Sequence, residues 1–262
     1  MSAVAGLLAD LDAEGGDLDA LVAGLDAAGL ATPTPAAGWS IAHQLAHLAW
    51  TDRQAIQAAT DPAGFLEAAK AANPLSYVED GANEGVGEAP ESLLGRWRDG
   101  RAALRAALAA VPADARIPWF GPPMKATSMA TARIMETWAH GQDVADALGV
   151  RLVPTHRLRH IAHLGVRTMG FAFVSRGESA PETPVRVELI GPDGDRWEWG
   201  PPEAVDRVSG DALDFCLHVV RRRHPDDLGL TVTGPVATKW MSIAQAFAGP
   251  PGADREPGQF NA

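Results

Sequence analysis

Hydrophobic positions in the first half of the chain recur at the spacing of an α-helix. The pattern predicts helices at residues 3–29, 40–60, 91–110 and 127–148. Ser40 is expected to cap the second helix, because its hydroxyl can accept an unpaired backbone N–H. Gly149 is expected to end the fourth, since glycine is typical just past a helix C-terminus. Four helices of this kind predict a four-helix bundle.

The segment 73–90 interrupts the helical pattern. It holds proline, asparagine and glycine, carries several acidic residues and shows no clear hydrophobic period. We therefore expect a long loop here. Long loops inside compact domains are often functional or mobile, although the sequence assigns no role to this one.

The pattern changes after Gly149. One more helix is expected after Pro154. The stretch 185–199 then alternates apolar with polar residues on either side of Asp193–Gly194, which is the signature of a β-hairpin. The remainder predicts a helix capped by Ser209 or Asp211, then a short strand and a closing helix, in the sequences SGDALDFCLHVVRRR, LTVTGP and ATKWMSIAQAFAG.

The change in pattern indicates two domains. We expect an all-α domain over residues 1–152 and a smaller α+β domain over residues 153–262. A chain of 262 residues has room for both, and it can bury a sizeable core without disulfides. Its single cysteine, Cys216, excludes an intrachain disulfide and indicates a reducing compartment.

Charge and hydropathy narrow the expected partners. The formal net charge of −11 disfavours nucleic acid and anionic membranes as partners. The sequence shows neither a readable signal peptide nor an apolar run of about 18 residues. A cytoplasmic location is therefore the expectation, with small molecules as the ligands.

The most informative polar residues lie in the fourth predicted helix. Glu136 and His140 are four residues apart and so share one helix face, on which Asp143 follows. His47, in an apolar stretch of the second helix, is a candidate third ligand. Two histidines and a carboxylate with an open position are typical of catalytic zinc, and iron(II) accepts the same set.

Two alternatives to this metal site stay open at this point. A polar stripe on an alanine-rich helix is most simply a face exposed to solvent. His43 lies one turn before His47, so either histidine, or neither, is the ligand.

A second group of histidines is a rival metal site. His156, His160 and His163 fall on one face of the predicted fifth helix. Arg157, Arg159 and Arg167 lie on the same helix, and nearby cations oppose the binding of a divalent cation. We interpret this group as a polar helix face.

The strings WSIAHQLAHLAWTD and ARIMETWAHGQDVADALG resemble the N-terminal domain of the mycothiol-dependent maleylpyruvate isomerase family, within the DinB-like superfamily. The resemblance implies a DinB-like bundle whose metal ligands are His47, Glu136 and His140. Asp143 follows these ligands as it does in the family, and its expected role is either to orient a ligand or to be a polar residue of the helix face. The family binds zinc and uses mycothiol, a low-molecular-weight thiol, but zinc, nickel, iron and manganese share such ligands.

The resemblance extends into the second half, where the family has a small α+β domain similar to sterol carrier protein 2. Gly210 and Asp214 match its Gly-x-x-x-Asp pattern, and Arg222 matches a later arginine. Arg222 is thereby predicted to be catalytic, holding a substrate carboxylate in two hydrogen bonds. A solvated arginine within the run 221–223 is the alternative. Because the chain departs from the family in 73–90, the substrate need not be maleylpyruvate.

These features predict a metal-dependent isomerase or thiol transferase. A metal-bound thiol loses its proton and can add to an electrophilic carbon of the substrate. Cys216 lies in an apolar stretch and is expected to pack in the core, so the thiol would be external. One alternative is a non-catalytic metal-binding bundle joined to a lipid- or acyl-carrier domain. Another is a stress-induced relative that binds metal without turnover. The metal, the electrophile and the oligomeric state stay open.

Overall fold

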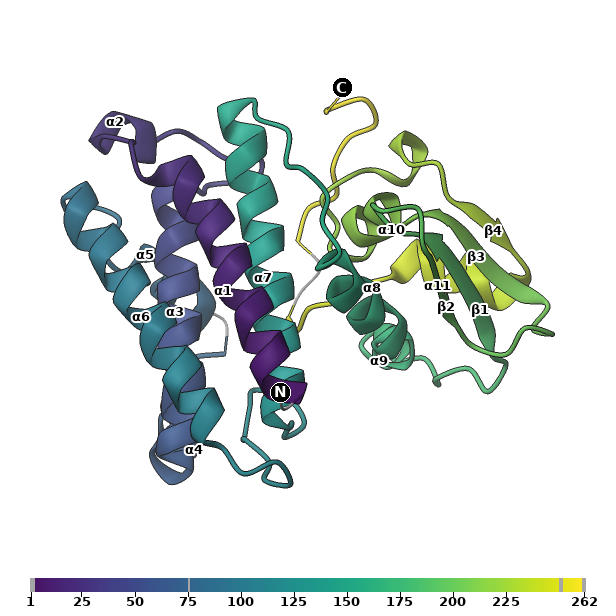
Figure 1. Ribbon diagram of the computed structural model, residues 1–262, viewed down its shortest axis with the longest axis horizontal. Coiled ribbons are helices and arrows are strands. Elements are labelled where there is room, and N and C mark those ends of the chain that lie inside the picture. The colour runs from purple at the N-terminus through teal and green to yellow at the C-terminus, as the bar shows by residue number, and fades with distance from the viewer. Residues whose placement is uncertain (1–2, 75, 250–251, 261–262) are drawn as a thin grey trace. The chain divides into compact units, whose positions relative to one another are not determined.

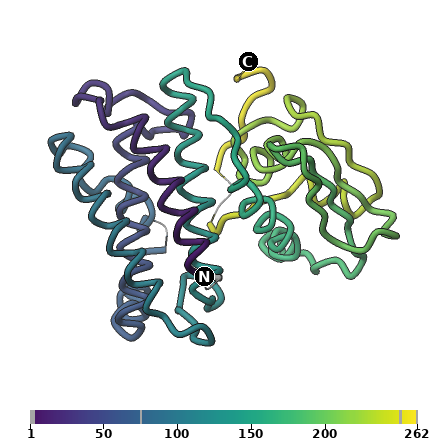
Figure 2. Tube along the Cα trace, viewed as in Figure 1, coloured from purple at the N-terminus to yellow at the C-terminus, as the bar shows by residue number. Residues whose placement is uncertain are grey.

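The computed structural model describes residues 3–74, 76–249 and 252–260. The chain divides into two compact units, Met1–Arg151 and Leu152–Ala262 (Figures 1 and 2). The first unit is helical, whereas the second combines helices with a small sheet. None of the helices in the described ranges has the length and apolar character needed to cross a membrane.

Four long helices lie side by side in the first unit (Figure 1). Helix α1 packs against α7, and α3 packs against both α6 and α7. The four predicted long helices are therefore present, although the first ends at Val22 and does not continue to residue 29. The helices of this unit are α1 (Ala3–Val22), α2 (Ala27–Leu30), α3 (Ile41–Thr60), α4 (Pro62–Ala71), α5 (Tyr77–Asn83), α6 (Pro90–Ala110) and α7 (Ala126–Leu148).

Capping residues define the ends of the two helices that matter most for function. Ser40 is the N-cap of α3, as predicted. Gly149 ends α7 in the left-handed conformation with φ of 66°, also as predicted, because glycine adopts this conformation without a Cβ clash.

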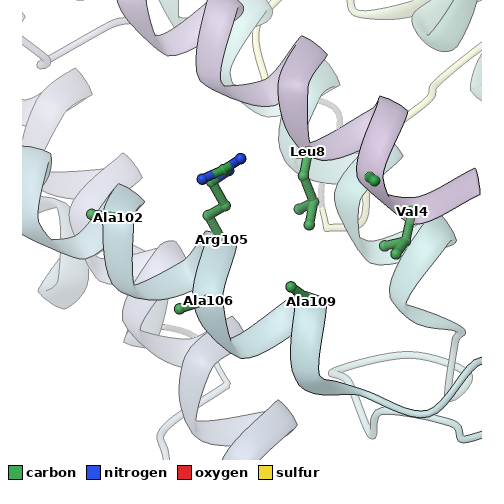
Figure 3. Close-up of a pocket in the computed structure, with 7 residues that line it drawn as sticks. Val4, Leu8, Ala102, Arg105, Ala106 and Ala109 are labelled. Carbon is green, nitrogen blue, oxygen red and sulfur yellow. The ribbon is translucent and has the colours of Figure 1, made fainter. Parts of the chain in front are cut away.

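Two clusters of apolar side chains form the core of this unit. One surrounds Leu45, Leu48 and Trp97, and the other surrounds Phe65 and Leu104. The small side chains of α6 leave a shallow pocket of about 310 Å³ against α1 (Figure 3). Burial of these apolar surfaces is the main stabilising contribution to the packing of the bundle.

Gly15 explains a break in the hydrophobic pattern of α1. A Cβ at this position would lie 2.3 Å from the guanidinium carbon of Arg101 on α6. The same guanidinium stacks over the Trp97 ring at 4.8 Å. The glycine therefore lets a large cation pack between two helices.

The prediction of a loop over residues 73–90 was wrong for its central part. Residues Tyr77–Asn83 form helix α5, which packs against α3. The buried residues are Gly81 and Ala82, so the short helix presents small side chains rather than large apolar ones to its neighbour. That is why the segment carried no visible hydrophobic period.

The second unit contains a four-stranded sheet in the order β2-β1-β3-β4. Strands β1 and β2 form the predicted antiparallel hairpin, with Val187 opposite Trp199 and Ile190 opposite Arg196. Helices α10 and α11 pack on the sheet, and α8 and α9 pack against these helices. The elements are α8 (Leu158–Arg167), α9 (Met169–Val174), β1 (Val185–Ile190), β2 (Arg196–Trp199), β3 (Asp206–Asp211), α10 (Ala212–Val219), a 3-10 turn (Pro225–Asp227), β4 (Thr231–Thr233) and α11 (Pro235–Ile243).

Strand β3 was not predicted from the sequence. It pairs parallel with β1, so it lies inside the sheet despite its polar sequence DRVSGD. Its buried aspartate, Asp206, accepts a hydrogen bond of 2.8 Å from the backbone N–H of Ala237 in α11. Of the two predicted caps of α10, Asp211 is the one observed, and Ser209 belongs to β3.

Candidate metal centre

Helices α3 and α7 bring the three predicted ligands together. His47 lies on α3, and Glu136 and His140 lie on α7. The Nε2 atoms of His47 and His140 are 3.6 Å and 3.3 Å from the same carboxylate oxygen, Oε2 of Glu136. Among the described residues, this is the one group of three metal-ligating side chains whose ligand atoms all lie within 4.8 Å of one another.

The structure separates His47 from His43. Nδ1 of His43 accepts a hydrogen bond of 3.1 Å from the backbone N–H of Ser40, so His43 helps to cap the start of α3. His47 lies one turn further along, with its ring centroid 4.6 Å from that of His140. Of the two histidines, His47 is therefore the one that reaches the group.

The face of α7 that carries Glu136 and His140 points into the bundle. Arg133 and Asp143 on this face are 2% and 0% exposed, and His140 is also buried. The alternative that this stripe faces solvent is therefore wrong. Asp143, predicted to orient a ligand, is a core residue of α7, and that role stays a prediction.

Aromatic rings enclose the two histidines. The Trp39 ring lies 5.3 Å from that of His47 and 6.0 Å from that of His140. On the other side, the ring of Trp50 lies 6.0 Å from that of His47. These indoles limit the freedom of the imidazoles and keep water from most of their surface.

A chain of hydrogen bonds sets the orientation of His140. Its Nδ1 lies 2.5 Å from Oε1 of Gln44, a fully buried residue of α3. The Gln44 amide nitrogen donates to Oγ1 of Thr34 at 2.8 Å, and that hydroxyl donates to the backbone carbonyl of Trp39. The chain fixes Oε1 as the acceptor, so Nδ1 of His140 carries the proton and Nε2 keeps its lone pair toward Glu136.

The charge state of Glu136 suits a metal ligand. Burial alone would raise the pKa of this carboxyl. The neighbouring imidazoles of His140 and His47, together with the charge of Arg133, instead hold its pKa well below the usual range. One carboxylate and a histidine lone pair thus face each other, which is the donor set that a divalent cation requires.

Sequence reasoning missed Gln44 and Thr34. The one signal in the sequence is that a glutamine sits three residues before His47 in an otherwise apolar helix. A buried amide needs hydrogen-bond partners, which indicates a structured polar contact at that position.

The rival histidines do not come together as a metal site. His156 and His163 are exposed, and the indole N–H of Trp199 donates to Nδ1 of His163 at 3.2 Å. The buried side of α8 consists of apolar and small residues: Leu158, Ile161, Ala162 and Gly165. This agrees with the interpretation of a polar helix face.

The predicted residues of the second unit lie around α10. Gly210 has a φ of 152°, and a Cβ at this position would lie 3.0 Å from the side chain of Leu230. Asp214 accepts a hydrogen bond of 2.8 Å from the backbone N–H of Gly229. Arg222 follows α10, is half-buried, and donates from Nη1 to the carbonyl of Val220 at 2.8 Å. Its catalytic role stays a prediction.

Comparisons with known proteins agree with this architecture. Two uncharacterised proteins of Mycobacterium tuberculosis, from strains CDC 1551 / Oshkosh and ATCC 25618 / H37Rv, are each 56% identical over 250 residues, which is 95% of this chain and 97% of theirs. The crystal structure of the mycothiol-dependent maleylpyruvate isomerase, and that of a histidine-to-alanine mutant, match with a TM-score of 0.60 at 17% identity. Each match covers 89% of this chain and 95% of the other.

At that identity the structural likeness establishes the fold alone: a helical N-terminal part followed by a small α/β part. The sequence itself matches the mycothiol maleylpyruvate isomerase N-terminal domain family over residues 11–145. This range holds α3, α7 and all three candidate ligands. The chain therefore belongs to the mycothiol maleylpyruvate isomerase N-terminal domain family.

Proposed function

We propose that this protein is a metal-dependent enzyme that activates a low-molecular-weight thiol, such as mycothiol, for addition to an electrophilic substrate. The observation that carries the proposal is the convergence of two histidine Nε2 atoms on one carboxylate oxygen of Glu136. Membership of the family supports the thiol. Isomerisation and thiol transfer both fit this chemistry.

The proposed ligands are His47, Glu136 and His140, and zinc is the proposed metal. Two imidazoles and one carboxylate leave a further position open, as in catalytic zinc sites. When bound there, a divalent cation supplies Lewis acidity that deprotonates a coordinated thiol at neutral pH.

The residues around the ligands have separate tasks in this proposal. Gln44 holds His140 in the tautomer whose Nε2 binds. Trp39 and Trp50 shield the histidines from water, which strengthens the electrostatic interactions among the charged groups. Asp143 is proposed to support the ligand-bearing face of α7 from within the core.

The chemical step uses a thiol from outside the chain. The sulfur gives up its proton to solvent and forms a C–S bond to an electrophilic carbon of the substrate, and the displaced π electron pair moves onto the electron-withdrawing group conjugated with that carbon. In an isomerase, the former C=C bond becomes a single bond, rotates, and reforms as the thiolate leaves. In a transferase, the C–S bond stays, and a leaving group such as chloride departs with its electron pair.

The second unit is proposed to bind substrate. We propose that residues 1–152 and 153–262 are separate domains and that the latter is similar to sterol carrier protein 2. Arg222 would hold a substrate carboxylate in two hydrogen bonds. Arg222→Lys should then raise KM for maleylpyruvate and leave KM for an uncharged electrophile unchanged, with Arg223→Lys as the control. An equal effect on both substrates would contradict this role.

The metal assignment is tested by elemental analysis of purified protein. Wild-type protein and His43→Ala should each carry close to one divalent metal ion, because His43 caps α3 instead of facing Glu136. His47→Ala should lose it. Near-stoichiometric metal in His47→Ala would refute the ligand set.

The thiol assignment is tested by turnover. Zinc-loaded protein is incubated with mycothiol and either maleylpyruvate or 1-chloro-2,4-dinitrobenzene, beside metal-free protein. A metal-dependent rate with either substrate is expected, and the substrate that reacts distinguishes isomerase from transferase. No rate above the metal-free protein with both substrates would contradict the proposal.

A further inference from the structure

A pocket of about 320 Å³ opens beside the metal centre, which is within the size range of small-molecule sites. Helices α3, α4 and α5 and the segment before α7 form it. Its floor consists of three aromatic rings, Trp50, Tyr77 and Phe120, whose centroids are 5.0–6.2 Å apart. One wall is made of small side chains: Ala68, Ala69 and Ala72.

Trp50 connects this pocket with the metal centre. Its ring packs against that of His47 at 6.0 Å, and the same residue lines the pocket. Gly81 of α5 lets the indole pack closely against this helix, because a Cβ there would lie 2.4 Å from the ring. Trp50 therefore contacts both a candidate metal ligand and the pocket.

The rim of the pocket is polar, but its charged groups are already engaged. Arg53 donates to both carboxylate oxygens of Glu84 at 2.9 Å and 2.7 Å. Asp80 accepts a hydrogen bond of 2.8 Å from the hydroxyl of Ser76. The rim thus carries one cation, Arg53, and two carboxylates, Asp80 and Glu84. Because Glu84 neutralises Arg53, the remaining negative charge repels anions.

The chemistry of the floor selects for shape. Aromatic rings bind flat apolar groups by stacking, and each such contact contributes beyond the area it buries. Burial raises the pKa of Tyr77, so its phenol stays uncharged at neutral pH. The floor therefore offers no cation to pair with a substrate carboxylate.

We infer that this pocket binds the uncharged, planar, apolar part of the electrophilic substrate, as an aryl or conjugated hydrocarbon group would provide. The inference rests on the proposed function in one respect, because it takes the molecule in the pocket to be the electrophilic substrate of the thiol reaction. A substrate carboxylate, if there is one, would bind away from this pocket.

The assignment gives a role to the segment 73–90. Four pocket residues come from α5 and its flanks: Tyr77, Asp80, Gly81 and Glu84. These four residues would therefore help to determine which electrophile the protein accepts.

The test measures binding without any turnover. 2-Naphthol, neutral at pH 7, and 2-naphthoate, its carboxylate analogue, are titrated into the metal-free full-length protein by calorimetry. We expect saturable binding of 2-naphthol at one site and affinity for 2-naphthoate at least about tenfold weaker, because the rim disfavours a negative charge.

A matched pair of variants locates the site. Ala68→Leu fills the pocket, whereas Ala71→Leu adds the same side chain on α4 away from it. Leucine is nearly as good a helix former as alanine, so both variants should fold. Ala68→Leu should weaken 2-naphthol binding at least about tenfold and Ala71→Leu less than about twofold, because only the first occupies ligand volume.

Three results would overturn the inference: no saturable binding of 2-naphthol, equal affinity in Ala68→Leu, or 2-naphthoate binding as tightly as 2-naphthol. Kinetics separate it from the proposed function. With an aryl electrophile, Ala68→Leu should raise KM with kcat retained. If the protein binds 2-naphthol but shows no thiol turnover, only the proposed function is refuted. If it shows thiol turnover but does not bind 2-naphthol, only the assignment of the pocket is refuted.

Discussion

Arg133 of α7 donates from Nε to Oδ1 of Asp52 on α3 at 2.9 Å, with both side chains buried. Arg133 lies three residues before Glu136, and Asp52 lies five residues after His47. The pair thus joins the two helices that carry the candidate ligands. Nη2 of Arg133 is buried without a hydrogen-bond partner among the described residues, and burial raises the pKa of Asp52 despite the arginine.

Breaking this pair should strongly destabilise the protein. Asp52→Asn removes the carboxylate that is hydrogen-bonded to the buried guanidinium of Arg133, and breaking a buried pair in this way typically costs about 3–5 kcal/mol in the free energy of unfolding. Urea unfolding of the metal-free protein measures the loss. As a control, Asp19→Asn removes the exposed partner of Arg98 and should cost less than about 1 kcal/mol. An equally small loss of unfolding free energy in both variants would show that the buried pair does not stabilise the contact between α3 and α7.

Gln44 should matter for metal affinity rather than for folding alone. Gln44→Leu removes the acceptor that fixes the tautomer of His140, and the loss of such a partner typically weakens metal binding by about 10–100-fold. Competition with a chelating dye measures the change. Gln44→Glu keeps an acceptor at this position and should restore part of the affinity.

Gln57→Leu is the matched control for Gln44, since it makes the same substitution on α3 at a half-buried position. Its metal affinity should stay close to that of the wild type. If Gln44→Leu binds metal as tightly as the wild type, Gln44 does not contribute to metal binding.

The sequence contained the positions of the ligands but not the direction in which they face. Spacing alone places Glu136 and His140 on one side of α7. That helix is rich in alanine, so its buried and exposed faces differ little in hydropathy, and the period does not show which face is the core. Only tertiary packing of α7 against α1 and α3 settles that the polar stripe points inward.

Two of the elements missed in the sequence, α5 and β3, share a cause, which is burial with few large apolar side chains. Helix α5 packs through Gly81 and Ala82, and β3 lies inside its sheet with Asp206 buried. Asp206 is tolerated because it accepts a hydrogen bond from the start of α11, a partner distant in sequence. The hairpin over 185–199 was predictable because strict alternation and Asp193–Gly194 are local signals.

Cys216 should be inert in the folded protein. Burial raises the pKa of its thiol well above the usual value, and Sγ donates to the carbonyl of Leu158 at 3.3 Å. Ellman's reagent at pH 8 should therefore label the native protein negligibly and the guanidinium-unfolded protein fully. Rapid stoichiometric labelling of the native protein would contradict the buried placement. Cys216→Ala should keep thiol-dependent turnover within about twofold, because the reacting thiol is external.

The pH dependence of metal binding should report the two histidines. Only neutral imidazole binds a metal, so protons compete with the cation at Nε2, and affinity should fall as pH decreases. Lowering the pH from 7.5 to 5.5 should therefore weaken metal binding.

Glu136 should not contribute to that change. Its pKa in the folded protein is held well below the usual value of 4.5, so its contribution to stability is present above that value and is lost only as pH falls through the lowered pKa. Between pH 7.5 and 5.5 the carboxylate therefore stays ionised. Metal titrations across this range, beside urea unfolding of the metal-free protein at each pH, separate ligand protonation from loss of fold. A flat affinity across the range would show that His47 and His140 do not bind the metal.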